Sequence, residues 1–414
     1  MSIKDNFPSV GPSLSLNFAR SKTLDPRITF SRTSSSGDAT YTDANGLIIT
    51  AADDEPRFDH KIENGVVKSL GLLVEEQRTN LVINNEDLSL WKQNSNPTLN
   101  SNDTVSPDGN TTADKLTQTT QVYTGVSTDM SGITTNTVYS CSVFIKPDGD
   151  TRTRFGFYDT SNWQGSLDTD WSSGEPSTNG SLGGASDIVY EEYPNGWYRA
   201  SFKASTQSNA FAGTVAFYCH PDRTGTGKSA WFWGAQLEEG EFLTSYIPTS
   251  GSTATRSPDN VSMTGTNFSD FYNQDEGTVY VSQKLKAVQD TARNNLVYRI
   301  NGGGGSDYLY NTKSGDKNIF VFGDGGTNYS RFQVGTDSTD TKTAWAYDVS
   351  GDDFKPYYNG IEVTNETDNN TPSATSHTQL ELGASSGAKY CGHIQQFAYY
   401  PKRLTNTQLQ NLTK

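Results

Sequence analysis

Residues 69–82 contain the densest run of large aliphatic side chains in the first 130 residues, and this run constrains the fold most. The sequence there is Ser-Leu-Gly-Leu-Leu-Val-Glu-Glu-Gln-Arg-Thr-Asn-Leu-Val, so an apolar stretch leads directly into a charged block. A helix that spans a bilayer needs about 20 apolar residues, and this run is much shorter. It therefore predicts a buried strand that leads into a polar turn.

The composition of the whole chain favours an all-β fold. Hydrophobic residues make up 33% of the 414 residues, but aromatic residues reach 11%, and there are 38 glycines. Aromatic and β-branched residues fit half-buried strands, whereas glycine is typical of the turns between them. Because aromatic runs recur throughout, the chain is not of the disordered class. Its length predicts two or three domains.

Charge and apolar patterning exclude several partners. The formal net charge is −15, and lysine and arginine are mostly scattered singly, so we expect no nucleic-acid partner. No segment approaches about 18 consecutive apolar residues, so we expect no membrane insertion. The N-terminal residues lead into no apolar run, which predicts a chain made without a signal peptide. Cys141, Cys219 and Cys391 show no CxxC spacing and are expected to be buried free thiols.

Strand and turn signals divide the chain into four parts. We expect a strand-poor N-terminal docking module at 1–82, a β-sandwich at 83–250, a polar linker at 251–268 and a second β-sandwich at 269–414. The two sandwiches are expected to fold as separate fragments. Asn-Gly pairs at 45–46 and 359–360 predict hairpin turns. Thr405 and Gln408 form the pattern of a capping box, which predicts a short C-terminal helix.

Arginine and carboxylate residues cluster in the first module. The candidates for a structural, docking role are Arg27, Arg57, Glu75, Glu76 and Arg78. Guanidinium groups pair with carboxylates in two-pronged geometry, so these residues are expected to hold a module that has little apolar core. A catalytic reading needs a cleft and a tuned carboxylate pair, and the sequence indicates neither.

No common catalytic motif is present. The chain has no Gly-x-Ser-x-Gly, no His-Glu-x-x-His and no P-loop, and its four histidines lie far apart in the sequence. We therefore expect a protein that is not an enzyme. A glycosidase needs only two suitably spaced carboxylates, so a glycan-degrading enzyme stays as the weakest alternative.

Three separated motifs resemble those of tailed-bacteriophage virion proteins. They are Leu-Asp-Pro-Arg-Ile-Thr-Phe-Ser-Arg at 24–32, Glu-Pro-Arg-Phe-Asp at 55–59 and Gly-Leu-Leu-Val-Glu-Glu-Gln-Arg-Thr-Asn-Leu at 71–81. The resemblance implies a tail-fibre or other structural protein on the tail or capsid surface, made in the host cytoplasm. It also implies other virion proteins as partners and a homo-oligomer.

The second module resembles the carbohydrate-binding jelly rolls of glycoside hydrolases and phage fibres, through Trp-Gly-Ala-Gln-Leu-Glu-Glu-Gly at 233–240 and Ser-Tyr-Ile-Pro-Thr at 245–249. The resemblance implies aromatic platforms that stack on sugars. Trp163 and Trp171 lie in a polar stretch, 159–184, and are the candidate platforms, whereas Trp231 and Trp233 fit a strand core. We expect Trp171→Ala to weaken adhesion to the host with little change in melting.

The third module resembles concanavalin-A-like and laminin-G-like sandwiches, through Gly-His-Ile-Gln-Gln-Phe-Ala-Tyr-Tyr-Pro-Lys-Arg-Leu-Thr at 392–405. That family often carries structural calcium, but the acidic turns near 324 and 352 have no ligand spacing, so metal binding is left open and no cofactor is expected.

These observations predict a non-enzymatic phage virion protein that contacts a host-surface glycan or neighbouring virion proteins through the rims of its sandwiches. A capsid decoration or fibre protein with a purely structural role is the alternative.

Overall fold

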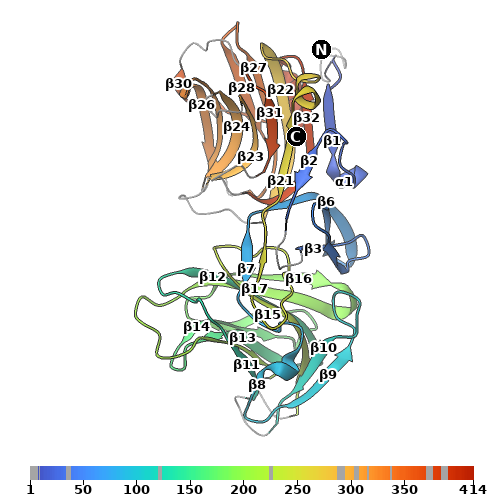
Figure 1. Cartoon of the computed structure of the whole chain (residues 1–414), viewed down its shortest axis with the longest axis vertical. Helices are drawn as coiled ribbons and strands as arrows, with labels where there is room; N and C mark the ends of the chain where they lie inside the picture. The colour runs from blue at the N-terminus through green and yellow to red at the C-terminus, as the bar shows by residue number, and fades with distance from the viewer. Residues whose placement is uncertain are drawn as a thin grey trace.

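The computed structural model describes residues 8, 10–33, 39–119, 124–222, 227–286, 294–302, 307–314, 317–335, 338–369, 376–383 and 390–414. Within them the chain is all-β, as predicted, and forms two stacked β-sandwiches (Figure 1). We call the lower one, built from β8 to β19, the inserted sandwich. The upper one, built from β1, β2, β5, β6 and β21 to β32, is the split sandwich.

Two six-stranded sheets form the inserted sandwich in the described residues. The first sheet has the order β16 (Ser186–Tyr193), β17 (Trp197–Ser205), β12 (Val138–Asp148), β19 (Ser229–Glu239), β10 (Ala113–Thr117), β9 (Thr98–Thr104). The second has the order β15 (Ser177–Leu182), β14 (Trp163–Asp170), β13 (Arg152–Tyr158), β18 (Ala216–His220), β11 (Gly125–Asp129), β8 (Lys92–Asn94). Buried side chains of both sheets meet in one core, including Val143 and Phe232 from the first and Phe155 and Phe217 from the second.

The split sandwich consists of two eight-stranded sheets in the described residues. One runs β29 (Ile361–Glu362), β28 (Asp353–Tyr358), β27 (Asp340–Asp348), β22 (Glu276–Leu285), β32 (Cys391–Tyr400), β6 (Val66–Glu75), β5 (Arg57–Glu63), and β1 (Leu14–Asn17) also pairs with β32. The other runs β2 (Thr29–Ser31), β21 (Asn260–Thr264), β31 (Gln379–Leu382), β23 (Asn294–Asn301), β24 (Tyr308–Ser314), β25 (Lys317–Asp324), β26 (Thr327–Gly335), β30 (Glu366–Asn369).

Strand pairing corrects the predicted domain boundaries. β6 pairs with β32 through Leu72 and Ile394, β1 pairs with the other half of β32, and β2 pairs with β21. Residues of the predicted module 1–82 therefore complete the sandwich that was assigned to 269–414. The predicted linker 251–268 contains β20 (Ala254–Arg256), β21 and most of α2 (Thr266–Ser269). Local patterns could not show this, because the partners are hundreds of residues apart.

A two-stranded ribbon joins the two sandwiches. β7 (Arg78–Asn80) and β20 are antiparallel, with Asn80 opposite Ala254 and Arg78 opposite Arg256. The chain leaves the split sandwich along β7 and returns along β20 (Figure 1). The sandwich that lies between these strands in sequence is thus an insertion into the other one.

The apolar run at 70–74 forms the buried end of β6. Leu72, Leu73 and Val74 are completely buried, as predicted for a core strand. Gly71 has φ of +97°, and a Cβ built there would lie 2.4 Å from the carbonyl oxygen of Ile394. Only glycine fits this close approach, since other residues are strained at that φ and would clash.

Several local predictions are confirmed. Asn359 and Gly360 both have positive φ and join β28 to β29, while the turn around 45–46 joins β3 (Ala39–Thr42) to β4 (Ile48–Ala51). The side chain of Thr405 accepts from the Gln408 N–H in a capping box that begins α3 (Asn406–Thr413). The three cysteines are buried free thiols, and burial raises the pKa of each. In the part of the chain that the structure describes, the other short helices are α1 (Phe18–Ser21), η2 (Leu88–Leu90) and η3 (Pro194–Gly196).

None of the described helices has the length and apolar character needed to cross a membrane.

Candidate functional site

The two sandwiches meet at an apolar contact beside the ribbon. The β3–β4 hairpin places Ile48 against aromatic side chains on the outer face of the first inserted sheet. The hydroxyl of Thr40 donates to the carbonyl oxygen of Tyr246 at 2.5 Å. Members of this cluster are Ile48, Ala113, Phe144, Trp197, Trp233 and Tyr246. The hairpin therefore packs against the inserted sandwich, and Trp233 is a core residue as expected.

A buried ionic network lies behind this contact. Arg57 Nη1 lies 2.8 Å from Glu75 Oε2, and Arg57 Nη2 lies 2.5 Å from Asp259 Oδ2. Arg32 Nη1 is 3.0 Å from the other oxygen of Asp259. All four side chains are completely buried, so each charge depends on its partners for the interactions that water would otherwise supply.

Glu75 connects this network to the inserted sandwich. It lies 3.1 Å from Arg256 and 3.0 Å from Lys286, and it accepts hydrogen bonds from the backbone N–H and the hydroxyl of Ser245. Burial alone would raise the pKa of Glu75, but the cations Arg256, Lys286 and Arg57 hold it well below its ordinary value. A single carboxylate thus binds groups from both sandwiches and from the returning strand.

Arg78 and Glu76 form a second buried pair at the ribbon. Arg78 Nη2 is 2.5 Å from Glu76 Oε1, and Nη1 donates to the carbonyl oxygen of Glu239. The guanidinium also lies over the ring of Phe242, 4.7 Å from its centroid. Gly240 packs directly on this guanidinium, where a Cβ would overlap Nη1. Arg57, Glu75, Glu76 and Arg78 are therefore brought together at the junction.

Arg27 lies elsewhere. It pairs with Asp25 at 2.8 Å, and its side chain is 33% exposed. The sequence did not point to Arg256, Asp259 and Lys286 as members of the network. Asp259 stands in Ser-Pro-Asp-Asn, which is typical of a linker turn, and Lys286 follows a strand and lies 211 residues after Glu75. The repeated arginine and carboxylate residues of the first 82 residues were the local signal that indicated a network of ion pairs.

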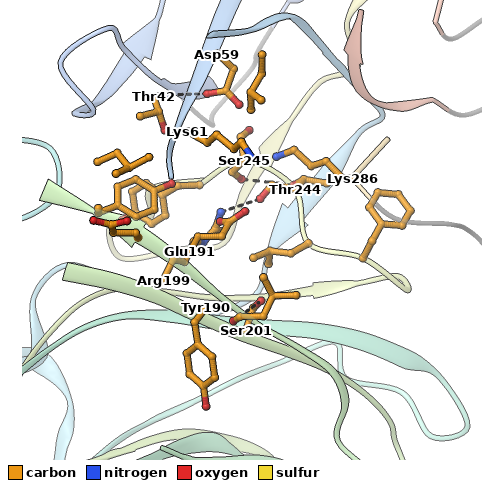
Figure 2. A pocket seen from close by; sticks show the side chains of 18 of the residues that line it. Thr42, Asp59, Lys61, Tyr190, Glu191, Arg199, Ser201, Thr244, Ser245 and Lys286 are labelled. Carbon is orange, nitrogen blue, oxygen red and sulfur yellow. Dashed lines mark hydrogen bonds between the residues drawn. The ribbon is translucent and has the colours of Figure 1, made fainter. Parts of the chain in front are cut away.

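A pocket of about 610 Å³ opens in front of the network, between the sandwiches. Its volume is in the range of pockets that hold small organic ligands. Figure 2 shows Asp59, Lys61 and Lys286 of the split sandwich facing Glu191 and Arg199 of the inserted sandwich. The aromatic residues of the lining are Tyr41, Tyr190, Tyr193, Tyr198, Phe202, Phe242 and Tyr246.

Asp59 is held rigidly in the pocket wall. Its Oδ1 accepts from the backbone N–H of Thr42 at 2.8 Å, and its Oδ2 is 2.7 Å from His393 Nε2. Burial acts to raise the pKa of Asp59, but the hydrogen bond to His393 and the nearby charges lower it overall. His60 Nδ1 contacts the carbonyl oxygen of Thr42 at 3.0 Å. These bonds fix the wall and keep Asp59 ionised.

The structure corrects the expectation for Trp171. Its side chain is 2% exposed within the apolar core, and Nε1 donates to the hydroxyl of Thr153 at 3.0 Å. The stretch 159–184 was expected to be a loop, but it supplies β14 and β15. Cross-strand ion pairs of Arg154 with Asp168 and of Arg152 with Asp170 stabilise the pairing of β14 with β13.

Trp163 is half-buried at the start of β14 and lies outside the core cluster. Its ring centroid is 5.3 Å from that of Tyr158 and 5.8 Å from that of Tyr218. The guanidinium of Arg154 lies over it at 5.5 Å. Trp163 thus belongs to an aromatic group on the outer face of the second inserted sheet, whereas Trp231 is half-buried between Lys115 and Lys146.

Among the described residues, no three histidine, cysteine or acidic side chains are grouped so as to hold a metal ion.

The fold and the site define a class: an all-β protein in which one sandwich is inserted into another and a pocket lies at their junction. No family model matches the chain, and no curated protein matches it.

Solved structures offer only distant likenesses. The CBM40 of the Ruminococcus gnavus IT-sialidase, bound to α2,3 sialyllactose, is 17% identical, with a TM-score of 0.30 over 36% of this chain and 88% of its own. The NanB sialidase of Streptococcus pneumoniae is 16% identical, with a TM-score of 0.30 over 36% of this chain and 26% of its own. The binding domain of botulinum neurotoxin DC, in complex with rat synaptotagmin II, is 8% identical, with a TM-score of 0.31 over 37% of this chain and 39% of its own. Likenesses of this size identify neither a family nor a ligand for this chain.

Proposed function

We propose that the chain is a non-enzymatic surface protein of a tailed-phage particle and that the junction pocket binds a saccharide of the host surface. Other virion proteins and further copies of the chain are its proposed partners. The phage assignment rests on the resemblance of residues 24–32, 55–59 and 71–81. The observation that carries the binding assignment is the pocket of about 610 Å³ between the two sandwiches.

The lining of the pocket suits a hydroxyl-rich ligand with apolar faces. Tyrosine rings offer surfaces on which the C–H faces of a pyranose can pack, with a polar group at the edge. Glu191 is exposed on β16 and forms no ion pair with any described residue. Glu241, which is half-buried and also lines the pocket, likewise forms no ion pair with any described residue. Both carboxylates can accept hydrogen bonds from sugar hydroxyls.

Binding without turnover fits the carboxyl groups of the pocket. A glycosidase needs a general acid whose pKa is raised. Two carboxyl groups of the lining have shifted pKa values, and both shifts are downward. The pKa of Asp59 is lowered chiefly through His393 against the effect of burial, and hydrogen bonds from Lys61 and Lys68 lower that of Glu63 to about 2.

Binding of the intact chain to an array of bacterial surface oligosaccharides tests this proposal. We expect one group of related sugars to bind, and Glu191→Gln to weaken that binding about tenfold, since it removes a charged hydrogen-bond acceptor. Glu362→Gln is the matched control, because Glu362 lies on an edge strand of the split sandwich and accepts from Tyr357 there.

An array with no bound sugar, or equal binding by the Glu191 and Glu362 variants, would remove the pocket as a saccharide site. Release of reducing ends from the bound polysaccharide would instead make the chain an enzyme. Antibody labelling of purified particles tests the virion assignment separately.

The aromatic group around Trp163 is a second candidate for the saccharide site. Trp163, Tyr158 and Tyr218 gather on the outer face of a sheet, beside Arg154. We expect Trp163→Ala to leave melting nearly unchanged, and to weaken sugar binding if this face is the site. Trp171→Ala is the contrast, because deleting a buried tryptophan costs about 3–5 kcal/mol of folding free energy. Sugar binding that survives Trp163→Ala leaves the pocket as the site.

A further inference from the structure

Two lysines of the split sandwich line the same wall of the pocket. Lys61 is on β5 and Lys284 is on β22, and both line the pocket. The two side chains are near enough for the charge of Lys61 to contribute to lowering the pKa of Lys284. Like charges at this range repel, so the arrangement costs free energy unless an anion is near.

The carboxylates on this wall do not balance the lysines. Glu63 lies 2.8 Å from Lys61 and also contacts Lys68, while Asp340 lies opposite Lys284 on the neighbouring strand. Three ammonium groups therefore share two carboxylates, and one positive charge remains. Burial, followed by the charge of Lys61, lowers the pKa of Lys284, whereas the hydrogen bond to Glu63 raises that of Lys61.

Charge elsewhere around the pocket favours the lysine wall as the place where an anion binds. The wall formed by the inserted sandwich is rich in carboxylates, namely Glu175, Asp187, Glu191 and Glu192. On that wall Lys203 is paired with Asp187. Arg199 is buried and donates to the Ser142 hydroxyl and to the carbonyl oxygen of Thr244, and its Nη2 has no hydrogen-bond partner among the described residues. His393, the strand neighbour of Lys284, is engaged by Asp59. A ligand carboxylate is thus attracted to the lysine wall and repelled from the opposite one.

We propose that the junction pocket selects saccharides that carry a carboxylate, and that this carboxylate binds between Lys61 and Lys284. The hydroxyl groups of the same ligand then face Glu191 across the pocket. This inference rests on the proposed function and names the chemical class of its ligand.

The test compares matched ligands on the intact chain. Uronic-acid oligosaccharides are offered beside the same oligosaccharides with their carboxyl groups reduced to neutral alcohols. We expect the acidic form to bind about tenfold more tightly, since it adds charge-assisted hydrogen bonds. We also expect this advantage to shrink as salt rises toward about 1 M, where the screening length falls to about 3 Å.

Variants locate the carboxylate. Lys284→Met and Lys61→Met should each lose about tenfold in affinity for the acidic form and little for the reduced form. Lys284→Arg keeps the charge and should retain most of the preference. Lys92→Met is the control, because Lys92 is an exposed lysine on the inserted sandwich that pairs with Asp129 away from the pocket. A melting curve for each variant shows that it is folded.

The outcomes separate the two proposals. Equal binding of the acidic and reduced sugars would overturn the carboxylate inference and leave saccharide binding in place. A preference that persists in both methionine variants would also overturn it, because the carboxylate must then bind elsewhere. Absence of binding to either form, on this panel and on the wider array, would reject the proposed function itself.

Discussion

Arg57 and Arg27 show how much the surroundings of an arginine decide its effect on stability. Both pair with a carboxylate. Arg57 makes two ion pairs in a completely buried network, whereas Arg27 makes one where water also reaches. A buried carboxylate that loses its partner cannot recover the interaction from solvent.

We expect Arg57→Met to lower the free energy of unfolding by about 3–5 kcal/mol, because it leaves Glu75 and Asp259 less compensated. Arg27→Met should cost no more than about 1 kcal/mol. Urea unfolding of both variants at pH 7.5 measures the difference. Equal losses in the two variants would show that the buried network adds nothing beyond a surface pair.

His377 makes stability depend on pH. Its ring is buried against Tyr272, whose hydroxyl lies 2.7 Å from Nδ1, and burial lowers the pKa of His377 to about 4. An unfolded histidine has a pKa of about 6.5. Between these values the unfolded chain binds a proton that the folded chain does not. Folding therefore loses stability as pH falls from about 6.5 to 4, by about 3 kcal/mol in total.

Replacing His377 by Asn should flatten the stability profile between pH 6.5 and 4.5, as measured by urea unfolding. Glu75 and Asp59 do not interfere, because their folded pKa values are lowered. The stability that they contribute is complete above about pH 4.5 and is lost only below it. Parallel profiles for the variant and the parent chain would contradict the assignment to His377.

At the scale of strands and helices, the elements that were predicted correctly are those with local signals. The Asn-Gly turn at 359–360 needs two residues with positive φ, and the capping box of Thr405 and Gln408 needs residues three apart. The apolar run of β6 was recognisable by its length. Each of these signals lies within about ten residues, so a single sequence contains it whole.

The elements that were not predicted pair with strands that are distant in sequence, or have an amino-acid composition that is typical of turns. β14 and β15 are rich in serine, glycine and aspartate, so they read as a loop and Trp171 as exposed. Arg152 and Arg154 stand opposite Asp170 and Asp168, and this charge pattern was the signal that could have revealed the pairing of β14 with β13. The junction pocket had no such signal, because its two walls come from segments that meet only in the folded chain.

β1 is a short strand whose removal should be costly. Leu14 and Leu16 are buried in the core of the split sandwich, and the strand pairs with β32 through residues 396–399. We expect a chain that lacks residues 1–17 to lose about 3–6 kcal/mol of folding free energy from these two side chains. A chain that lacks residues 1–12 keeps β1 and is the control. Similar melting temperatures for the two truncations would contradict this role.

For the whole molecule, the insertion determines which fragments fold. The fragment 268–414 lacks β1, β2, β5, β6 and β21, so the earlier expectation that it folds alone is revised. Residues 82–250 keep both sheets of the inserted sandwich, and their ends lie close together, since Asn85 donates to Thr249. The split sandwich should fold once its two parts are rejoined.

We expect a chain in which an Asn-Gly turn joins Asn80 directly to Ala254 to melt cooperatively, because these two residues are opposite each other in the ribbon. The fragment 268–414 should aggregate, since its exposed sheet edges and uncovered core have no partners. Circular dichroism measures the melting of the two chains, and analytical gel filtration measures their aggregation. A soluble, cooperatively melting fragment 268–414 would show that the N-terminal strands are dispensable.

The place of β32 in the sequence also sets an order of events during synthesis. β6 ends at Glu75, but the strand that pairs with it begins at Cys391. At about 5–20 residues per second, the ribosome needs roughly 15–60 s to make the intervening chain. The inserted sandwich is complete long before that and is expected to fold first. The aliphatic segment of β6 can pair with β5 at once, but its other edge stays open beside a finished domain. The yield of native protein therefore depends on what shields that edge until β32 arrives.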